Sequence, residues 1–186
     1  MKNIMIVGVG GQGTLLTSRI IGNLAIKKGY DVKISEVHGM AQRGGSVVTY
    51  VRYGEKVYKP VIEEGEADVL ICFEKLEALR YLHYLKDSGI MLLNSIEILP
   101  ITSITGLQKY PEDIEQKLAG IKLITLNAKE KAIGLGNPKV ANVVILGMTA
   151  KVLGFDKEDW IQVIKETVPS KLLDLNLKAF EVGYNS

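Results

Sequence analysis

The sequence is poor in cysteine, and this limits the chemistry that the chain performs by itself. Among its 186 residues there is one cysteine, Cys72, inside an apolar run where a buried thiol is more common than a nucleophile. A single cysteine cannot ligate an iron–sulfur cluster or a structural zinc ion. We therefore expect no metal centre held by this chain alone.

Long apolar runs and a strong charge are also missing. No apolar run approaches the roughly 20 residues that span a bilayer, and a predicted strand near the amino terminus leaves no room for a signal peptide. The formal net charge is only +2, and no basic run alternates with aromatic residues. We expect a cytoplasmic protein that acts on neither a membrane nor a nucleic acid.

The order of predicted elements is typical of an α/β protein. The apolar run from Ile4 to Val9 indicates a parallel strand covered on both faces, and apolar residues then recur at helical spacing up to Gly29. Further strands are predicted at 32–36, 67–73, 90–93 and 122–126, and helices at 74–86, 111–118, 140–153, 156–167 and after 169. Without an internal repeat or a linker, residues 1–186 are expected to form one domain.

One segment departs from a doubly wound nucleotide-binding fold. Residues 46–53 are β-branched and aromatic where such a fold continues with a helix, and Gly54-Glu55 separates them from a second short run, 56–58. This pattern favours a β-hairpin, or a strand with a short return. The predicted fold is therefore three-layer α/β: a mostly parallel sheet flanked by helices, with a Rossmann-like start and a β-hairpin insertion.

A glycine-rich turn follows the first strand. Gly8, Gly10 and Gly13 have the G-x-G-x-x-G spacing, which lets a backbone approach a phosphate that the N–H groups of the next helix bind. Glu36 lies about 20 residues further on, where a ribose-binding acid belongs in NAD or FAD sites. Two alternatives remain open. In the first, the glycines only allow a tight connection from the strand to the helix. In the second, the turn presents its N–H groups to another phosphate or to a partner chain.

A second segment decides between these alternatives. Residues 36–46 read Glu-Val-His-Gly-Met-Ala-Gln-Arg-Gly-Gly-Ser. Arg43, beside Gly44 and Gly45, suits bidentate recognition of a carboxylate or phosphate, because the missing side chains let a ligand approach the backbone. His38 adds an acid, a base or a hydrogen-bond donor. Taken alone, the segment is also compatible with a mobile surface loop that holds a solvated arginine.

Together the two segments resemble the gamma-type domain of the 2-oxoacid:ferredoxin oxidoreductases. The matching residues are the turn 8–13 and the motif 38–45, and the second motif is most similar to that of the indolepyruvate oxidoreductases. Asn137-Pro138 and Asn142, before an apolar helix containing Leu146-Gly147, agree with the later part of the family. The resemblance covers nearly the whole chain and implies one gamma-type domain over residues 1–186.

The resemblance implies an accessory subunit that performs no chemistry unaided. In this family a larger alpha subunit carries thiamine diphosphate with magnesium and the [4Fe-4S] clusters. The complex decarboxylates an arylpyruvate, reduces ferredoxin and passes the acyl group to coenzyme A, which the gamma-type domain helps to position. The expected partners are therefore the larger subunit and, through the complex, ferredoxin. The single cysteine, and the lack of a Gly-Asp-Gly and Asn-Asn run for thiamine diphosphate, agree with this division.

The candidate site combines residues from both segments. The glycines and Gln12 of the turn offer backbone and amide contacts to a phosphate or to the partner. By the resemblance, Arg43 binds an anionic group of coenzyme A or holds the partner's active-site loop. No residue is assigned as catalytic or as a metal ligand. The set for phosphate, coenzyme A or partner binding is Gly8, Gly10, Gly11, Gln12, Gly13, His38, Gln42, Arg43, Gly44 and Gly45.

Two polar residues, Asn94 and Glu74, lie at predicted strand ends, and two other functions are compatible with parts of the sequence. Asn94 lies where open α/β sheets bind ligands, but a simple turn is the favoured interpretation. Glu74 either faces the same crevice or favours the start of its helix through the helix dipole. One other function is that of a dinucleotide-binding protein, but the predicted strand after Glu36, in place of the expected helix, argues against it. The other is that of an assembly protein, in which the glycines only shape the backbone.

Overall fold

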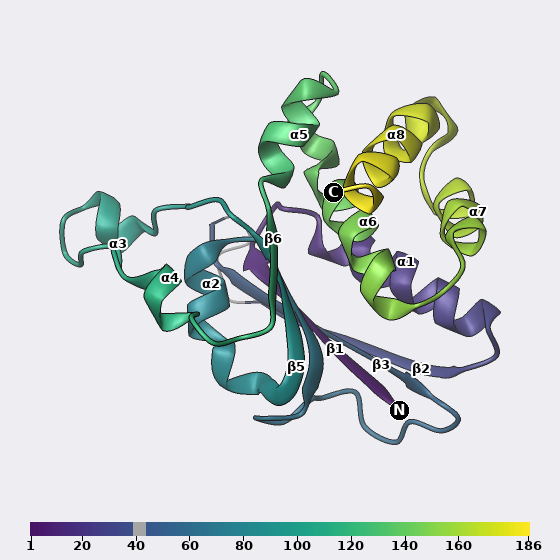
Figure 1. Ribbon diagram of the computed structural model, residues 1–186, viewed down its shortest axis with the longest axis horizontal. Helices are drawn as coiled ribbons and strands as arrows, with labels where there is room; N and C mark the ends of the chain where they lie inside the picture. Colours follow the sequence, from purple (N-terminus) through teal and green to yellow (C-terminus); the bar gives the residue numbers. More distant parts are fainter. Residues whose placement is uncertain (39–43) are drawn as a thin grey trace.

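A computed structural model describes residues 1–38 and 44–186. In this part of the chain a six-stranded sheet forms the middle layer, with the strand order β2-β3-β1-β4-β5-β6 (Figure 1). Strands β1, β4, β5 and β6 are parallel, whereas β3 is antiparallel to both of its neighbours. The strands are β1 (Lys2–Val9), β2 (Asp31–His38), β3 (Ser46–Gly54), β4 (Ala67–Cys72), β5 (Leu85–Asn94) and β6 (Leu123–Leu126).

Helices cover both faces of the sheet and complete the three layers (Figure 1). One face of β1, carrying Ile4 and Ile6, packs in a core with Trp160 and Phe180, and the other face, carrying Met5 and Val7, packs in a second core. This alternation explains why the strand is apolar at every position. The first core includes residues of α1 (Thr14–Lys27), α5 (Ala128–Gly134), α6 (Ala141–Leu153), α7 (Lys157–Thr167) and α8 (Leu173–Tyr184), and the second those of α2 (Lys75–Arg80) and α4 (Ile114–Lys117).

The predicted mostly parallel sheet is confirmed, but its antiparallel element is paired differently from the prediction. Strand β3 lies between β2 and β1, with Thr49 opposite both Glu36 and Ile6. Residues 56–58 are not a strand, and the Val57 N–H donates instead to the Asp31 carboxylate at 2.9 Å. Because β3 already has a hydrogen-bonded neighbour on each side, it has no free edge for a short return.

The predicted helix 74–86 is too long. Helix α2 ends at Arg80, a 3₁₀ turn covers Leu82–Tyr84, and Leu85 already belongs to β5, where it pairs with Ala67 of β4. The apolar spacing of residues 82–86 suits a helix, but the pairing of Leu85 with Ala67 of β4 overrides local propensity.

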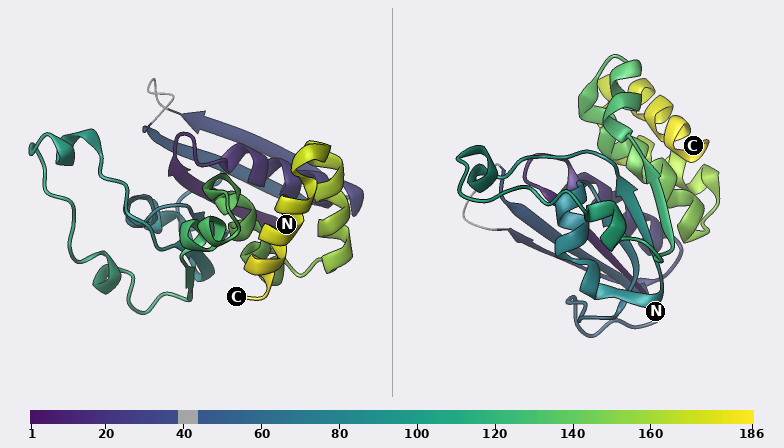
Figure 2. Two further views of the ribbon diagram at one scale, coloured as in Figure 1. Left: turned by 90° about the horizontal axis from the view of Figure 1, so that it is seen from above. Right: turned by 60° about the vertical axis from the view of Figure 1, so that its left-hand side comes forward.

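An arm, defined as residues 97–112, extends away from the sheet between β5 and β6 (Figure 2). It contains the short helix α3 (Ile101–Ile104), which has no buried residue. Its exposed apolar side chains are Leu99, Ile101, Ile104 and Leu107, with exposed fractions from 52% to 82%. Among the described helices, none is both long enough and apolar enough to cross a membrane.

Candidate functional site

The glycine-rich turn joins β1 to α1 at the edge of the sheet where the parallel strands end. Gly11 and Gly13 have φ angles of 99° and 86°, in the left-handed region that favours glycine. A Cβ atom on Gly13 would lie 2.5 Å from Nδ2 of Asn142 in α6, and one on Gly8 would lie 2.9 Å from Cβ of Phe73. The turn is therefore packed against both α6 and the end of β4, with no room for side chains at these two positions.

The Gln12 side chain is engaged within the protein. Its Oε1 accepts a hydrogen bond from the Val9 N–H at 2.6 Å, and its Nε2 donates to the Phe73 carbonyl at 3.0 Å. Gln12 thus ties the turn to the end of β4. The N–H groups of Gly11 and Gly13, in contrast, have no hydrogen-bond partner among the described residues. These two N–H groups are the donors that the turn offers to an anion.

The end of the second segment meets the turn. His38 is the last residue of β2, but its side chain, like Gln42 and Arg43, lies outside the described part of the chain. Gly44 has a left-handed φ of 79°. The Gly45 carbonyl accepts a hydrogen bond from the Gly10 N–H at 2.9 Å. The fold therefore joins two segments that are more than thirty positions apart in the sequence.

A cleft of about 670 Å³ opens beside the turn, along the ends of β4 and β5. Its lining includes residues 11–13, Lys129 at the start of α5 and Lys139 just before α6. Both lysines are exposed, and neither has an ion-pair partner among the described residues. The carboxyl edge of parallel strands is the usual place for a ligand in an open α/β sheet.

The two lysines were missed by reasoning from the sequence, although a signal is present. Each lies two positions after an asparagine, in Asn127-Ala128-Lys129 and Asn137-Pro138-Lys139. Asn127 caps α5 by accepting from the Glu130 N–H at 3.0 Å, and Asn137 accepts from the Lys139 N–H at 3.0 Å. The repeated Asn-x-Lys pattern therefore places one lysine in the first turn of each of two helical segments that border the cleft.

Asn94 is not part of a simple turn, and that interpretation is wrong. The residue is 2% exposed and lines the cleft. Its Nδ2 donates to the Phe73 carbonyl at 3.1 Å, and its Oδ1 accepts from the Ala128 N–H at 2.9 Å. Asn94 therefore connects the end of β4 to the first residue of α5.

Glu74 starts its helix and does not line the cleft. Its Oε2 accepts from the Glu77 N–H at 2.9 Å and so caps α2, which confirms the second interpretation of this residue. Its Oε1 accepts from the Ile98 N–H at 3.1 Å and from the Tyr110 hydroxyl at 2.8 Å. Burial, followed by this hydrogen bond, raises the pKa of the Tyr110 hydroxyl. Both ends of the arm are thus held by one buried carboxylate.

Cys72 is fully buried in β4. Burial, reinforced by the nearby carboxylates of Glu77 and Glu74, raises the pKa of its thiol well above the usual value. A thiol with a raised pKa is a poor nucleophile, as the sequence predicted for this residue.

The chain matches one known protein family over nearly its whole length. Residues 3–186 match the protein family described as pyruvate ferredoxin/flavodoxin oxidoreductase. The chain belongs to this family. The family match confirms the resemblance that the two glycine-containing segments indicated, and the dinucleotide-binding alternative is not supported.

Several members of the pyruvate ferredoxin/flavodoxin oxidoreductase family are similar along their whole length. Indolepyruvate oxidoreductase subunit IorB of Thermococcus kodakarensis is 43% identical over 188 residues, which cover 97% of this chain and 93% of that protein. The protein of the same name from Archaeoglobus fulgidus is 45% identical over 189 residues, covering 98% and 94%. The similarity thus covers nearly the full length of this chain and of these subunits.

Solved structures show the same fold. The gamma subunit of a keto/oxoacid ferredoxin oxidoreductase from Geobacter sulfurreducens has a TM-score of 0.75 at 25% identity, over 100% of this chain and 97% of that one. A 2-oxoglutarate:ferredoxin oxidoreductase from Magnetococcus marinus has a TM-score of 0.78 at 18% identity, over 99% of this chain but 30% of that one. The fold therefore occurs both as a separate subunit and as one part of a longer chain.

Proposed function

We propose that this chain is the accessory subunit of an indolepyruvate:ferredoxin oxidoreductase. The complex oxidatively decarboxylates an arylpyruvate to an aryl-acetyl-CoA and reduces ferredoxin. The observation that carries this proposal is the 40% to 45% identity to proteins named indolepyruvate oxidoreductase subunit IorB. Relatives named for pyruvate, or for pyruvate and ketoisovalerate, are 27% to 29% identical.

The redox groups belong to the larger partner subunit in this proposal. A [4Fe-4S] cluster needs four cysteine thiolates, and this chain contains one cysteine, which is buried in a strand. We therefore assign the clusters, and with them thiamine diphosphate and magnesium, to the larger subunit. The accessory subunit then supplies binding and positioning, and electrons reach ferredoxin through the complex.

The cleft suits the phosphate groups of coenzyme A, whose thiol accepts the acyl group in this reaction. Gly11 and Gly13, whose N–H groups have no partner in the described part of the chain, line this cleft together with Lys129 and Lys139. Backbone N–H groups and ammonium groups are the common donors to phosphate. The volume of about 670 Å³ is in the range of cofactor and ligand pockets.

The remaining predicted residues have complementary roles in this proposal. Gly8 and Gln12 shape the turn, and Gly10 and Gly45 join it to the second segment. We propose that Arg43, next to Gly44, binds an anionic group of coenzyme A or holds the partner's active-site loop. His38 and Gln42 belong to the same set without an assigned acid–base role.

Exposed apolar side chains on the arm support the presence of a partner chain. A small protein rarely leaves several large aliphatic side chains exposed close together unless another surface covers them. Ile98, at the start of the arm, also lines the cleft. A larger subunit that brings its reaction centre to the cleft therefore meets the arm as well.

An anaerobic affinity purification of the tagged chain from its own host tests the proposed function. We expect a larger brown partner to co-purify, and the complex to reduce ferredoxin only when indolepyruvate and coenzyme A are both present. A colourless chain that purifies alone and binds NAD or FAD would contradict the proposal.

The Arg43→Ala variant of the same complex separates the two roles proposed for this residue. Loss of turnover with assembly intact would support binding of coenzyme A. Loss of assembly would support the contact with the partner. Normal turnover and normal assembly would exclude both roles.

A further inference from the structure

Two amide side chains converge on the backbone carbonyl of Phe73, a buried residue that lines the cleft. The Phe73 carbonyl accepts from Nε2 of Gln12 at 3.0 Å and from Nδ2 of Asn94 at 3.1 Å. Gln12 belongs to the turn after β1, Phe73 follows β4, and Asn94 ends β5. Phe73 and Asn94 are 1% and 2% exposed and Gln12 is half-buried, so the hydrogen bond from Asn94 is shielded from bulk water. One oxygen atom thus ties together the ends of three neighbouring strands.

The other end of the Asn94 amide reaches the start of α5. Its Oδ1 accepts from the N–H of Ala128, the first residue of α5, at 2.9 Å. Ala128 is fully buried, and the next residue is Lys129. Asn94 therefore determines where α5 begins relative to β4 and the turn, and Lys129 is placed by the same contact.

The chemistry of this position requires a primary amide of this length. The side chain donates to a carbonyl at one end and accepts from an N–H at the other, so exchanging its oxygen and nitrogen would place like groups together. An ionised aspartate lacks the donor, and leucine lacks both groups. The orientation of the amide is determined by its two backbone partners, the carbonyl of Phe73, which lines the cleft, and the N–H of Ala128, which precedes Lys129.

We propose that Asn94 is a positioning residue, which holds Lys129 at the correct distance from the N–H groups of Gly11 and Gly13, so that these residues of the cleft lining bind the same anion. The inference rests on the proposed function, in which that anion is a phosphate of coenzyme A. A displacement of about 1 Å between groups that bind one ligand together has a large effect on affinity or rate. Asn94 acts through Lys129 and the turn, without a contact of its own to the ligand.

The first test compares two buried asparagines in the purified two-subunit complex. Asn94→Leu removes both amide hydrogen bonds. Asn176→Leu is the matched control, because Asn176 is also buried, at 5% exposed, but donates to the Leu172 carbonyl at 2.7 Å, and neither residue lines the cleft. Calorimetry with coenzyme A and with adenosine 3′,5′-bisphosphate gives dissociation constants, steady-state kinetics give the KM values, and thermal unfolding gives the stability of each variant.

We expect Asn94→Leu to raise the dissociation constant for both ligands by about tenfold or more, while the KM for indolepyruvate stays unchanged. Asn176→Leu should lower the unfolding temperature without changing coenzyme A binding. Normal binding by Asn94→Leu, or equal losses in both variants, would overturn the inference. If the wild-type complex bound no coenzyme A, the function proposed for the cleft would fail together with the inference.

A second variant gives a test within one protein. In Asn94→Asp, a protonated carboxyl group donates to the Phe73 carbonyl and accepts from the Ala128 N–H, as the native amide does, whereas the ionised form cannot donate. Coenzyme A affinity should therefore fall as the pH rises through the pKa of the introduced group, which burial raises. The other titratable groups lining the cleft, Glu97, Lys129 and Lys139, are also present in the wild type, whose pH profile is the control. Identical profiles would overturn the inference.

Discussion

Gly11 and Gly13 lie two residues apart in the same turn, but they differ in their surroundings. Both have a left-handed φ angle, which costs an L-residue roughly 1–2 kcal/mol. A Cβ atom on Gly11 has no atom within 4 Å, whereas one on Gly13 would lie 2.5 Å from Asn142 Nδ2. The turn therefore requires glycine at position 11 for the backbone alone, and at position 13 for the backbone and for packing.

We expect Gly11→Ala to lower the free energy of unfolding by about 1 kcal/mol, and Gly13→Ala by about 3 kcal/mol. The difference arises because the added methyl group on Gly13 must displace Asn142 and the start of α6. Urea denaturation of the isolated chain measures both values. Equal effects of the two substitutions would show that α6 does not restrict the turn.

Lys129 and Lys139 are the cations that the cleft offers to an anionic ligand. A hydrogen bond to a charged group contributes about 1.5–3 kcal/mol, so replacing either lysine by alanine should raise the dissociation constant for coenzyme A roughly tenfold. Lys171→Ala, an exposed lysine outside the cleft without an ion-pair partner among described residues, is the control. Calorimetry on the complex measures the dissociation constant for coenzyme A. An unchanged value in both cleft variants would show that the lysines do not bind this ligand.

At the scale of elements, the contact between α6 and α8 supports the site from behind. A Cβ atom on Gly147 of α6 would lie 2.1 Å from the Phe180 carbonyl oxygen, and one on Gly183 of α8 would lie 1.8 Å from that of Val144. Backbone atoms cannot move aside as a flexible side chain does. The two glycines therefore allow the helices to pack backbone against backbone, and α6 in turn supplies Asn142 to the glycine-rich turn.

We expect Gly183→Ala to destabilise the protein by about 3 kcal/mol, because the two helices must separate. Gly134→Ala is the matched control: Gly134 is also helical, but its added Cβ atom would have no atom within 4 Å. Alanine there should be neutral, or stabilising by up to about 1 kcal/mol. Thermal unfolding compares the two variants, and similar stabilities would contradict the close contact.

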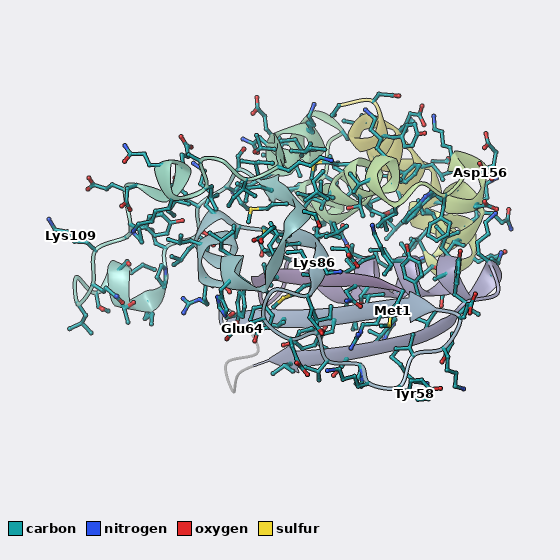
Figure 3. The ribbon with its side chains drawn as sticks, turned by 60° about the horizontal axis from the view of Figure 1, so that its bottom comes forward. Met1, Tyr58, Glu64, Lys86, Lys109 and Asp156 are labelled. Atoms are coloured by element: carbon teal, nitrogen blue, oxygen red, sulfur yellow. The ribbon has the colours of Figure 1, made fainter. Side chains whose placement is uncertain are left out.

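At the scale of the whole molecule, the arm and the loop after β3, residues 55–66, lie at opposite ends of the protein. In Figure 3, Lys109 in the arm and Tyr58 in the loop mark these two ends. The arm carries four exposed aliphatic side chains and adjoins the cleft. The loop exposes Tyr58 and Val61, but it lies at the opposite end of the strands from the glycine-rich turn. A partner that binds at the cleft should therefore cover the arm and leave the loop exposed.

Limited trypsin digestion tests this arrangement. In the isolated chain we expect early cleavage after both Lys109 and Lys56, since each is exposed in an irregular segment. In the two-subunit complex, cleavage after Lys109 should be suppressed and cleavage after Lys56 should continue, as followed by mass spectrometry. Equal cleavage after Lys109 with and without the partner would place the interface elsewhere.

The sequence by itself determined the elements whose signals are local. The apolar run of β1, the helical spacing of α1 and α6, and the glycines of the turn depend on neighbouring residues, so their patterns are visible without a structure. The two glycine-containing motifs were also sufficient for the family, because each combines unusual residues at defined spacing.

Only the tertiary structure decided which segments pair and which side chains meet. The position of β3 between β2 and β1, the early end of α2, and the hydrogen bond from Gly10 to Gly45 depend on residues distant in the chain. The same holds for Asn94, whose two partners are Phe73, just after β4, and Ala128, the first residue of α5. No local pattern encodes such contacts, because packing and hydrogen bonding across the sheet select among conformations that the local sequence leaves open.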